Sequence, residues 1–210
     1  MISKRIQDKG ILAKLLEQGI KILVIKYCKK IGSIRIDIMA SSIQIIKGEL
    51  HKINIIAEDI NYKDLLFDEF KLEANHLKIK FKMINKELYF KNNPIIEFKI
   101  SLSQNSLRTV LLSKSWNWIA NKISKEILNK AKLEDLKIKN GKLLIIASEK
   151  NITIKHENQI NIITEKGKVY LENKIHNKTS QIPIEDKIYI ENIYIENNLI
   201  NILANSTISF

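Results

Sequence analysis

The residues that most often catalyse reactions or bind metals are few in this sequence and widely spaced. Its single cysteine is Cys28, which excludes an intramolecular disulfide and a thiolate cluster within the chain. The four histidines show no metal-ligand spacing: His51, His76, His156 and His176. The sequence contains no nucleophile elbow and no glycine-rich phosphate loop. We therefore expect a protein that is not an enzyme and that uses no metal or cofactor.

Neighbouring carboxylates are a further candidate for acid–base chemistry. Glu58-Asp59 and Asp68-Glu69 are such pairs, and we interpret both as solvated strand ends or turns. Cys28 follows a predicted helix among lysines, which could lower the pKa of its thiol. Without a partner residue nearby in the sequence, we interpret it as a small core or boundary residue.

Positive charge is the most informative feature of the composition. The 210 residues include 35 Lys and Arg against 23 Asp and Glu, a formal net charge of +12. Residues 1–35 have nine basic and two acidic groups, and residues 103–132 have six and one, so these segments carry +7 and +5. The other two regions are balanced, with ten of each sign in 36–102 and in 133–210. The excess is therefore concentrated in two segments that could contact an anionic partner.

Nucleic acid is one class of anionic partner. A lysine-rich face could neutralise phosphates without sequence specificity. However, 32 of the 35 basic residues are lysine, aromatic residues total 14, and the sequence has no base-reading motif. We therefore expect nucleic acid not to be the partner. Non-specific nucleic-acid binding or a scaffold role through the basic helices is the alternative function.

The two positive segments coincide with two predicted helices. Apolar residues recur every three or four positions over 11–27, which predicts an amphipathic helix. A second helix is predicted from about 103 to 132, with Ser103 as its N-cap. Charged residues interrupt every apolar run in the first segment, so we expect neither a cleaved signal nor a membrane span. The expected location is the cytoplasm, with peripheral membrane attachment as an option.

The rest of the chain alternates with the period of two that is typical of strands. Asn140-Gly141 predicts a tight hairpin, and residues 165–168 and 197–198 predict two more. A slip in parity at Asn75-His76 predicts a bulge or bend. Residues 133–147 recur in pattern at 190–204, which we interpret as two hairpins of one sheet, with a recurring unit of an extended curved sheet as the alternative. The order of helix, strands, helix, strands predicts an α+β fold of antiparallel meanders.

The segment from Ile45 to Ile79 contains a motif of a glycine, spaced aliphatic residues and a tyrosine turn: Gly48, Leu50, Ile53, Ile55, Ala57, Tyr62, Leu65, Leu72 and Ile79. In these residues it resembles the LmeA-like family of bacterial phospholipid-binding domains. Later matches are Leu102, Ser103, Leu107, Leu112, Ser113, Ile188, Ile190, Ile193, Ile195 and Asn197. The resemblance extends over about residues 10–208 and concerns structural motifs, not catalytic ones. Asp64 and Asn198 stand where the family usually has glycine, and both residue types tolerate left-handed backbone.

The resemblance implies one domain, residues 1–210, with a tubular lipid-binding-like fold. In such a fold a curved antiparallel sheet wraps around a long N-terminal helix, and here a second long helix would lie in mid-chain. The implied function is non-enzymatic binding of phospholipid or another lipid in an apolar channel. Strand parity selects the residues that would line it: Leu12, Leu16, Leu23, Ile53, Ile55, Phe70, Leu72, Ile79, Phe81, Ile96 and Phe98. The same pattern is equally compatible with side chains that fill one another's space as a packed core.

The lysines of the two helical segments are the candidates for contact with an anionic membrane surface. These residues are Lys14, Lys21, Lys26, Lys29, Lys30, Lys122 and Lys125. A solvated basic face is the alternative interpretation. The sequence predicts no oligomeric state.

Overall fold

Isoleucine-rich alternation produces two antiparallel sheets in the computed structural model, which describes residues 10–82, 87–129, 132–148 and 155–207. The seven-stranded sheet has the order β1 (Ser33–Met39), β2 (Glu49–Tyr62), β3 (Leu65–Lys82), β5 (Ile95–Ser103), β12 (Leu199–Thr207) and β11 (Ile188–Glu196), and β4 (Glu87–Phe90) pairs with β3. The five-stranded sheet has the order β10 (Lys178–Gln181), β9 (Lys168–Asn173), β8 (Lys155–Glu165), β7 (Lys142–Ser148) and β6 (Lys132–Lys139). The predicted α+β class with antiparallel strands is confirmed.

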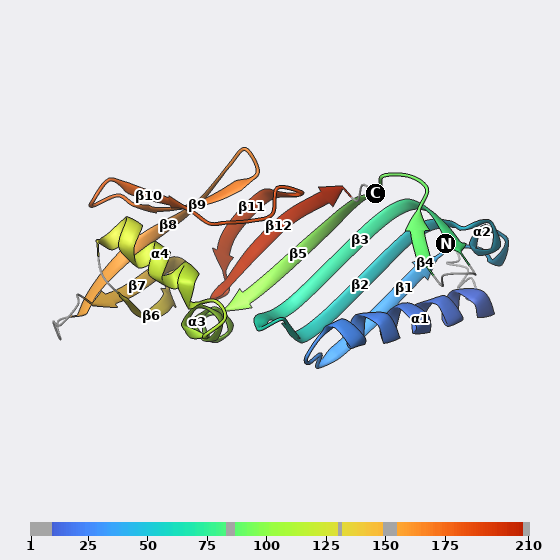
Figure 1. Ribbon diagram of the computed structural model, residues 1–210, viewed down its shortest axis with the longest axis horizontal. Coiled ribbons are helices and arrows are strands. Elements are labelled where there is room, and N and C mark those ends of the chain that lie inside the picture. Colours follow the sequence, from blue (N-terminus) through green and yellow to red (C-terminus); the bar gives the residue numbers. More distant parts are fainter. Residues whose placement is uncertain (1–9, 83–86, 130–131, 149–154, 208–210) are drawn as a thin grey trace, which may run out of the picture.

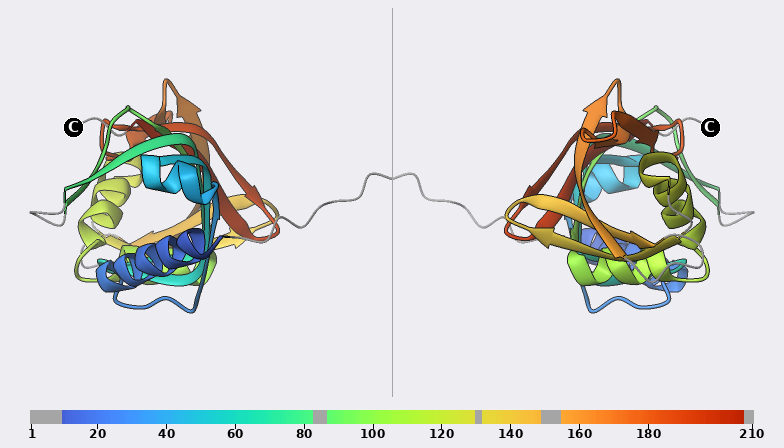
Figure 2. Two further views of the ribbon diagram at one scale, coloured as in Figure 1. Left: turned by 90° about the vertical axis from the view of Figure 1, so that its right-hand side faces the viewer. Right: turned by 90° about the vertical axis from the view of Figure 1, so that its left-hand side faces the viewer.

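The two sheets lie end to end in an elongated molecule, and helices lie along one of its sides (Figures 1 and 2). The helices of the described residues are α1 (Ile11–Tyr27), α2 (Ser42–Lys47), α3 (Gln104–Leu112) and α4 (Asn117–Leu128). Helix α1 packs along β1, at the edge of the seven-stranded sheet. Helices α3 and α4 lie against β6 and form the largest buried cluster together with the five-stranded sheet.

The first helix has the predicted bounds, but the second is shorter than predicted and divided in two. Ser103 caps α3 as expected, because its hydroxyl accepts the Ser106 N–H at 3.2 Å. Ser113 then takes an extended conformation and donates its hydroxyl to the Val110 carbonyl at 2.7 Å, which ends α3. Helix α4 ends before Asn129, which has a left-handed φ of 52°, and strand β6 follows. The prediction of one continuous helix over 103–132 is therefore wrong.

The predicted parity slip at Asn75-His76 is confirmed. His76 has a φ of 52°, and the buried residues on either side of it, Ala74 and Leu77, are three positions apart. The alternation of buried residues in the facing strand β2 shifts at the same place. Leu50 and Ile53, also three positions apart, are buried opposite Leu77 and Ala74. The two strands therefore keep their register through the irregularity.

Tight hairpins with positive φ at both central residues occur where the sequence predicts them. The φ angles are 52° and 70° at Asn140-Gly141, 48° and 76° at Lys166-Gly167, and 52° and 59° at Asn197-Asn198. These values belong to the two-residue turns whose twist matches that of the flanking strands.

The internal repeat has a structural counterpart. Hairpins β6–β7 and β11–β12 each contain a register shift at the same place, between Leu133 and Asp135 in one and between Ile190 and Asn192 in the other. These positions are 57 residues apart, like the sequence repeat. The interpretation as two hairpins of one sheet is wrong, because β6–β7 belongs to the five-stranded sheet and β11–β12 to the seven-stranded sheet.

Candidate functional site

One face of the seven-stranded sheet carries most of the residues predicted to line a channel. Ile55, Leu72 and Phe98 are direct partners across β2, β3 and β5, so they form one row. Ile36 and Ala204 extend that row onto β1 and β12. Because side chains of one row point to the same face, the register places these predicted residues side by side.

Two further apolar rows flank this central one. The first contains Ile38, Ile53, Ala74 and Ile96, and the second contains Ile34, Ala57, Phe70, Ile100 and Ile202. The rings of Phe70 and Phe98 stack across neighbouring rows, with centroids 6.2 Å apart. We call these three rows the apolar face. It includes six of the predicted channel residues: Ile53, Ile55, Phe70, Leu72, Ile96 and Phe98.

The apolar face is only partly covered by other elements. Ile38, Ile53 and Ala74 are buried, in the cluster against which α1 packs. The side chains toward the middle of the sheet remain partly accessible: Ile55, Phe70, Leu72, Ile96, Phe98, Ile100 and Ile202. The sheet therefore presents aromatic and aliphatic groups that its own helices do not seal.

The residues predicted at the ends of the channel have different positions. Ile79 packs on the α1 side of the apolar cluster, beyond the parity slip. Phe81 is in β3, but its side chain lies outside the described residues. Leu16 packs on the cluster and Leu12 is half-buried. Leu23 is 54% exposed, so its predicted inward position is wrong.

The exposure of Leu23 follows from the position of α1 at the sheet edge. The main neighbours of α1 are β1 and α2, and its contact with α2 includes Gly10, next to the Ser42 hydroxyl. Leu23 is in the other half of the helix, which contains no buried residue. Sequence periodicity identifies an apolar helix, but it does not show how much of that helix the sheet covers.

Sequence reasoning did not identify a second apolar region, beneath α3 and α4. A cavity of about 180 Å³ lies between these helices and both sheets, and the residues around it are all apolar. Its lining includes Leu107, Ile123, Leu143, Leu171, Ile193 and Ile202. Ile202 also belongs to the apolar face, so apolar side chains continue from one sheet to the other. The volume is below the roughly 300–1,000 Å³ of typical ligand pockets.

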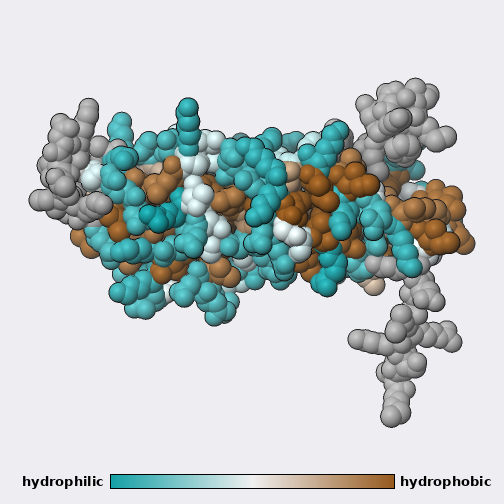
Figure 3. All heavy atoms as spheres, turned by 90° about the horizontal axis from the view of Figure 1, so that it is seen from below, coloured by the Kyte–Doolittle hydropathy of each residue, from teal (hydrophilic) through white to brown (hydrophobic). Residues whose placement is uncertain are grey.

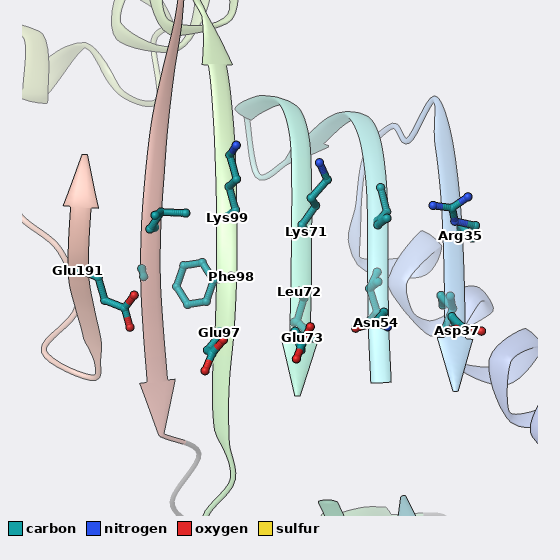
Figure 4. A pocket seen from close by; sticks show the side chains of 15 residues that line it. Arg35, Asp37, Asn54, Lys71, Leu72, Glu73, Glu97, Phe98, Lys99 and Glu191 are labelled. Atoms are coloured by element: carbon teal, nitrogen blue, oxygen red, sulfur yellow. The ribbon is translucent and has the colours of Figure 1, made fainter. Parts of the chain in front are cut away.

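The opposite face of the seven-stranded sheet has a polar groove of about 840 Å³. One row of side chains along it is basic, with Arg35, Lys71 and Lys99, and the next contains Glu73 and Glu97 (Figure 4). Register places Lys71 opposite Lys99 and Glu73 opposite Glu97. The sequence signal for this groove is a pair of opposite charges two positions apart, which recurs on β1, β3 and β5.

Two of the charged side chains of the polar groove, Lys71 and Glu73, have ion-pair partners within the protein. The Lys71 ammonium lies 2.8 Å from Glu69, and the Lys52 ammonium lies 2.6 Å from Glu73. Hydrogen bonds from Lys52 and, secondarily, from Asn75 hold the pKa of Glu73 below its ordinary value. A groove with charged walls does not suit an acyl chain, so the apolar face is the better candidate for a lipid.

The lysines predicted to contact a membrane belong to two groups. Lys14, Lys21 and Lys26 are on α1, and Lys29 and Lys30 follow it, whereas Lys122 and Lys125 are on α4 (Figure 1). Lys29 forms an ion pair with Asp64 at 2.7 Å, and the Lys122 ammonium donates to the Gln181 carbonyl at 3.2 Å. The α1 and α4 groups therefore occupy different parts of the molecule, and two of the amines have partners within the protein.

Residues that could bind a metal do not converge on a site in the described ranges. The described residues contain no group of three or more His, Cys, Asp or Glu side chains that could hold a metal ion. Burial raises the pKa of the Cys28 thiol, which makes the thiol less reactive. In the same ranges, no helix combines the length and the apolar character needed to cross a bilayer.

No protein-family model matches the chain, and no curated protein or solved structure shows significant similarity to it. The resemblance to LmeA-like domains therefore rests on the sequence motifs alone. Two of the motif positions have clear structural roles. Gly48 ends α2 with a φ of 75°, where a Cβ would lie 2.1 Å from the Ile79 carbonyl oxygen, and Ser103 caps α3. Such roles explain why these residue types stand at these positions, and they carry no information on a ligand.

Proposed function

We propose that the protein binds a lipid on the apolar face of the seven-stranded sheet and catalyses no reaction on it. The observation that carries the proposal is the alignment of three apolar rows whose central members, Ile55, Leu72 and Phe98, are only partly buried. Each methylene of an acyl chain that leaves water there contributes about 0.8 kcal/mol. Burial of several methylenes of an acyl chain would therefore give useful affinity without a specific polar group.

The proposal includes a tubular arrangement like that of the family the sequence resembles. Helices α1, α3 and α4 lie on the side of the sheets that carries the apolar residues, which supports such an enclosure (Figure 2). In this arrangement α1 forms a wall at the edge of the sheet, next to β1. The bound lipid would extend along the apolar face toward the cavity beneath α3 and α4.

Neighbouring isoleucines on β2 provide a matched test. Ile55 is on the apolar face, whereas Ile56 is on the other face of the same strand, in the row of Arg35, Lys71 and Lys99; both are partly buried. Ile55→Asp should abolish uptake of a fluorescent fatty acid or phospholipid, because it places a carboxylate in the acyl path. Ile56→Asp makes the same chemical change on the other face and should retain uptake.

Native mass spectrometry of the purified protein should show a co-purified lipid in the wild type and in Ile56→Asp. Circular dichroism establishes that each variant is folded, and Ile55→Asn is used if the aspartate variant does not fold. Full uptake by a folded Ile55 variant, or the same loss in both variants, would contradict binding on the apolar face.

A further inference from the structure

Helix α1 has a row of apolar side chains on the side that faces away from the sheet. Ile11, Leu15, Ile22 and Ile25 are between 48% and 78% exposed. Successive helical residues turn by about 100°, so these four lie within about 40° of one line along the helix. Ala13 and Ile20, which face the sheet, are on the opposite side. We call the four outward residues the α1 ridge.

A second helix at the same end of the molecule also has exposed apolar residues. Helix α2 contacts α1, and its Ile43 and Ile46 are 66% and 76% exposed. Hydrophobic residues gather on the surface at the α1 end of the molecule, seen from below in Figure 3. Single exposed apolar residues are common on proteins, but four on one side of a helix, interrupted only by Gln18, indicate an interaction surface.

The charges around the α1 ridge indicate what covers it. Lys14 and Lys21 flank the ridge on one side and Lys26 flanks it on the other. The one carboxylate of α1, Glu17, faces the sheet and accepts the Ile38 N–H at 2.8 Å. The outward surface of α1 therefore combines apolar residues with three lysines and no carboxylate of its own.

This combination favours a membrane over a protein partner. Lysine is depleted in protein–protein interfaces, and a two-fold contact between two ridges would bring lysines of like charge together. Helices that lie in the plane of a bilayer interface have an apolar side at the acyl boundary and lysines at the headgroups. We infer that α1 docks on an anionic bilayer, with the α1 ridge inserted and Lys14, Lys21 and Lys26 at the lipid phosphates.

Docking of α1 on a bilayer goes beyond lipid binding on the apolar face. Either proposal can be contradicted by experiment while the other holds. The test is co-sedimentation with vesicles of phosphatidylcholine and phosphatidylserine. Leu15→Ser with Ile22→Ser should lower the partition coefficient of the full chain at least tenfold. The matched control is Ile163→Ser with Ile175→Ser, which removes two other exposed isoleucines, 41% and 79% accessible, and should change binding by less than twofold.

Circular dichroism and the lipid uptake assay are measured on the same variants. The ridge variant should remain folded and retain uptake, which separates loss of docking from loss of the apolar site. Wild-type-like vesicle binding by the ridge variant would overturn the inference. A second outcome would also overturn the inference: the wild type is a dimer that does not bind vesicles, and the ridge substitutions dissociate that dimer. The α1 ridge would then be the contact between two copies of the chain.

Discussion

Asp64 lies in the turn between β2 and β3, where three distant segments of the chain meet. Its carboxylate accepts hydrogen bonds from Lys29, which follows α1, at 2.7 Å and from Ser115, between α3 and α4, at 3.0 Å. The indole N–H of Trp116 donates to the Lys63 carbonyl of the same turn at 3.1 Å. The φ of 67° at Asp64 agrees with the left-handed tolerance expected from its residue type. Its partners are 35 and 51 residues away, so sequence spacing did not indicate them.

The carboxylate of Asp64 should make stability depend on pH. The hydrogen bonds from Lys29 and then Ser115 lower the pKa of Asp64 in the folded protein. A lowered folded pKa gives a stabilising contribution that is present above the unfolded pKa, about 4, and lost as the pH falls through the folded value. The difference in unfolding free energy between wild type and Asp64→Asn should therefore be largest near neutral pH and disappear in acid.

Urea unfolding at several pH values measures this difference. Asp59→Asn is the control, because Asp59 is another aspartate with positive φ, 51°, and lies within β2 instead of in the turn that follows it. A wild-type advantage over Asp64→Asn that stays constant into strong acid would contradict the proposed ionic contribution.

At the scale of elements, sequence periodicity predicted the features that depend on residues close together in the sequence. Helix α1 has the predicted bounds because an uninterrupted apolar period extends over 11–27. The division between α3 and α4 was not predictable, since it coincides with the contact of Trp116 with the distant Lys63 turn. Helix α2 has only six residues, which is too short for a periodic signal. Parity placed the six predicted residues of the apolar face on one side of the sheet, but the alignment of rows between strands depends on tertiary register.

The polar groove contains cross-strand pairs of like charge, which are unfavourable in a sheet. Lys71 faces Lys99 and Glu73 faces Glu97. Glu97→Lys combined with Lys99→Glu keeps the composition and converts both pairs into pairs of opposite charge. The unfolding free energy should rise by about 0.4–2 kcal/mol, the sum of two favourable cross-strand pairs.

Chemical denaturation of the double variant at low and high salt tests the contribution of charge. The gain should shrink as salt increases, because these side chains lie on an accessible surface. An unchanged or lower stability at low salt would show that Glu69 and Lys52 already compensate the like charges in the wild type.

At the scale of the whole molecule, the fold separates apolar, polar and basic surfaces. The seven-stranded sheet has apolar side chains on the side of α1 and charged side chains on the other. Composition located the basic excess in the helical segments, but it did not show that α1 and α4 lie at different ends of the molecule (Figure 1). If α1 docks on a bilayer, the nearby edge of the apolar face also comes close to the leaflet that would supply a lipid.

The two groups of lysines should therefore contribute unequally to binding of anionic vesicles. Lys14 and Lys21 are on α1 beside the ridge, whereas the Lys122 amine is held by the Gln181 carbonyl on the α4 side. A lysine near an anionic leaflet contributes about 1 kcal/mol, which fades over about 10 Å at moderate salt.

Lys14→Glu with Lys21→Glu should weaken binding by about tenfold or more, as measured by co-sedimentation at increasing fractions of phosphatidylserine. Lys122→Glu with Lys125→Glu makes the same change in net charge and should have a much smaller effect. Equal losses in the two double variants would mean that general attraction to the net charge, and not docking through α1, holds the protein at the membrane.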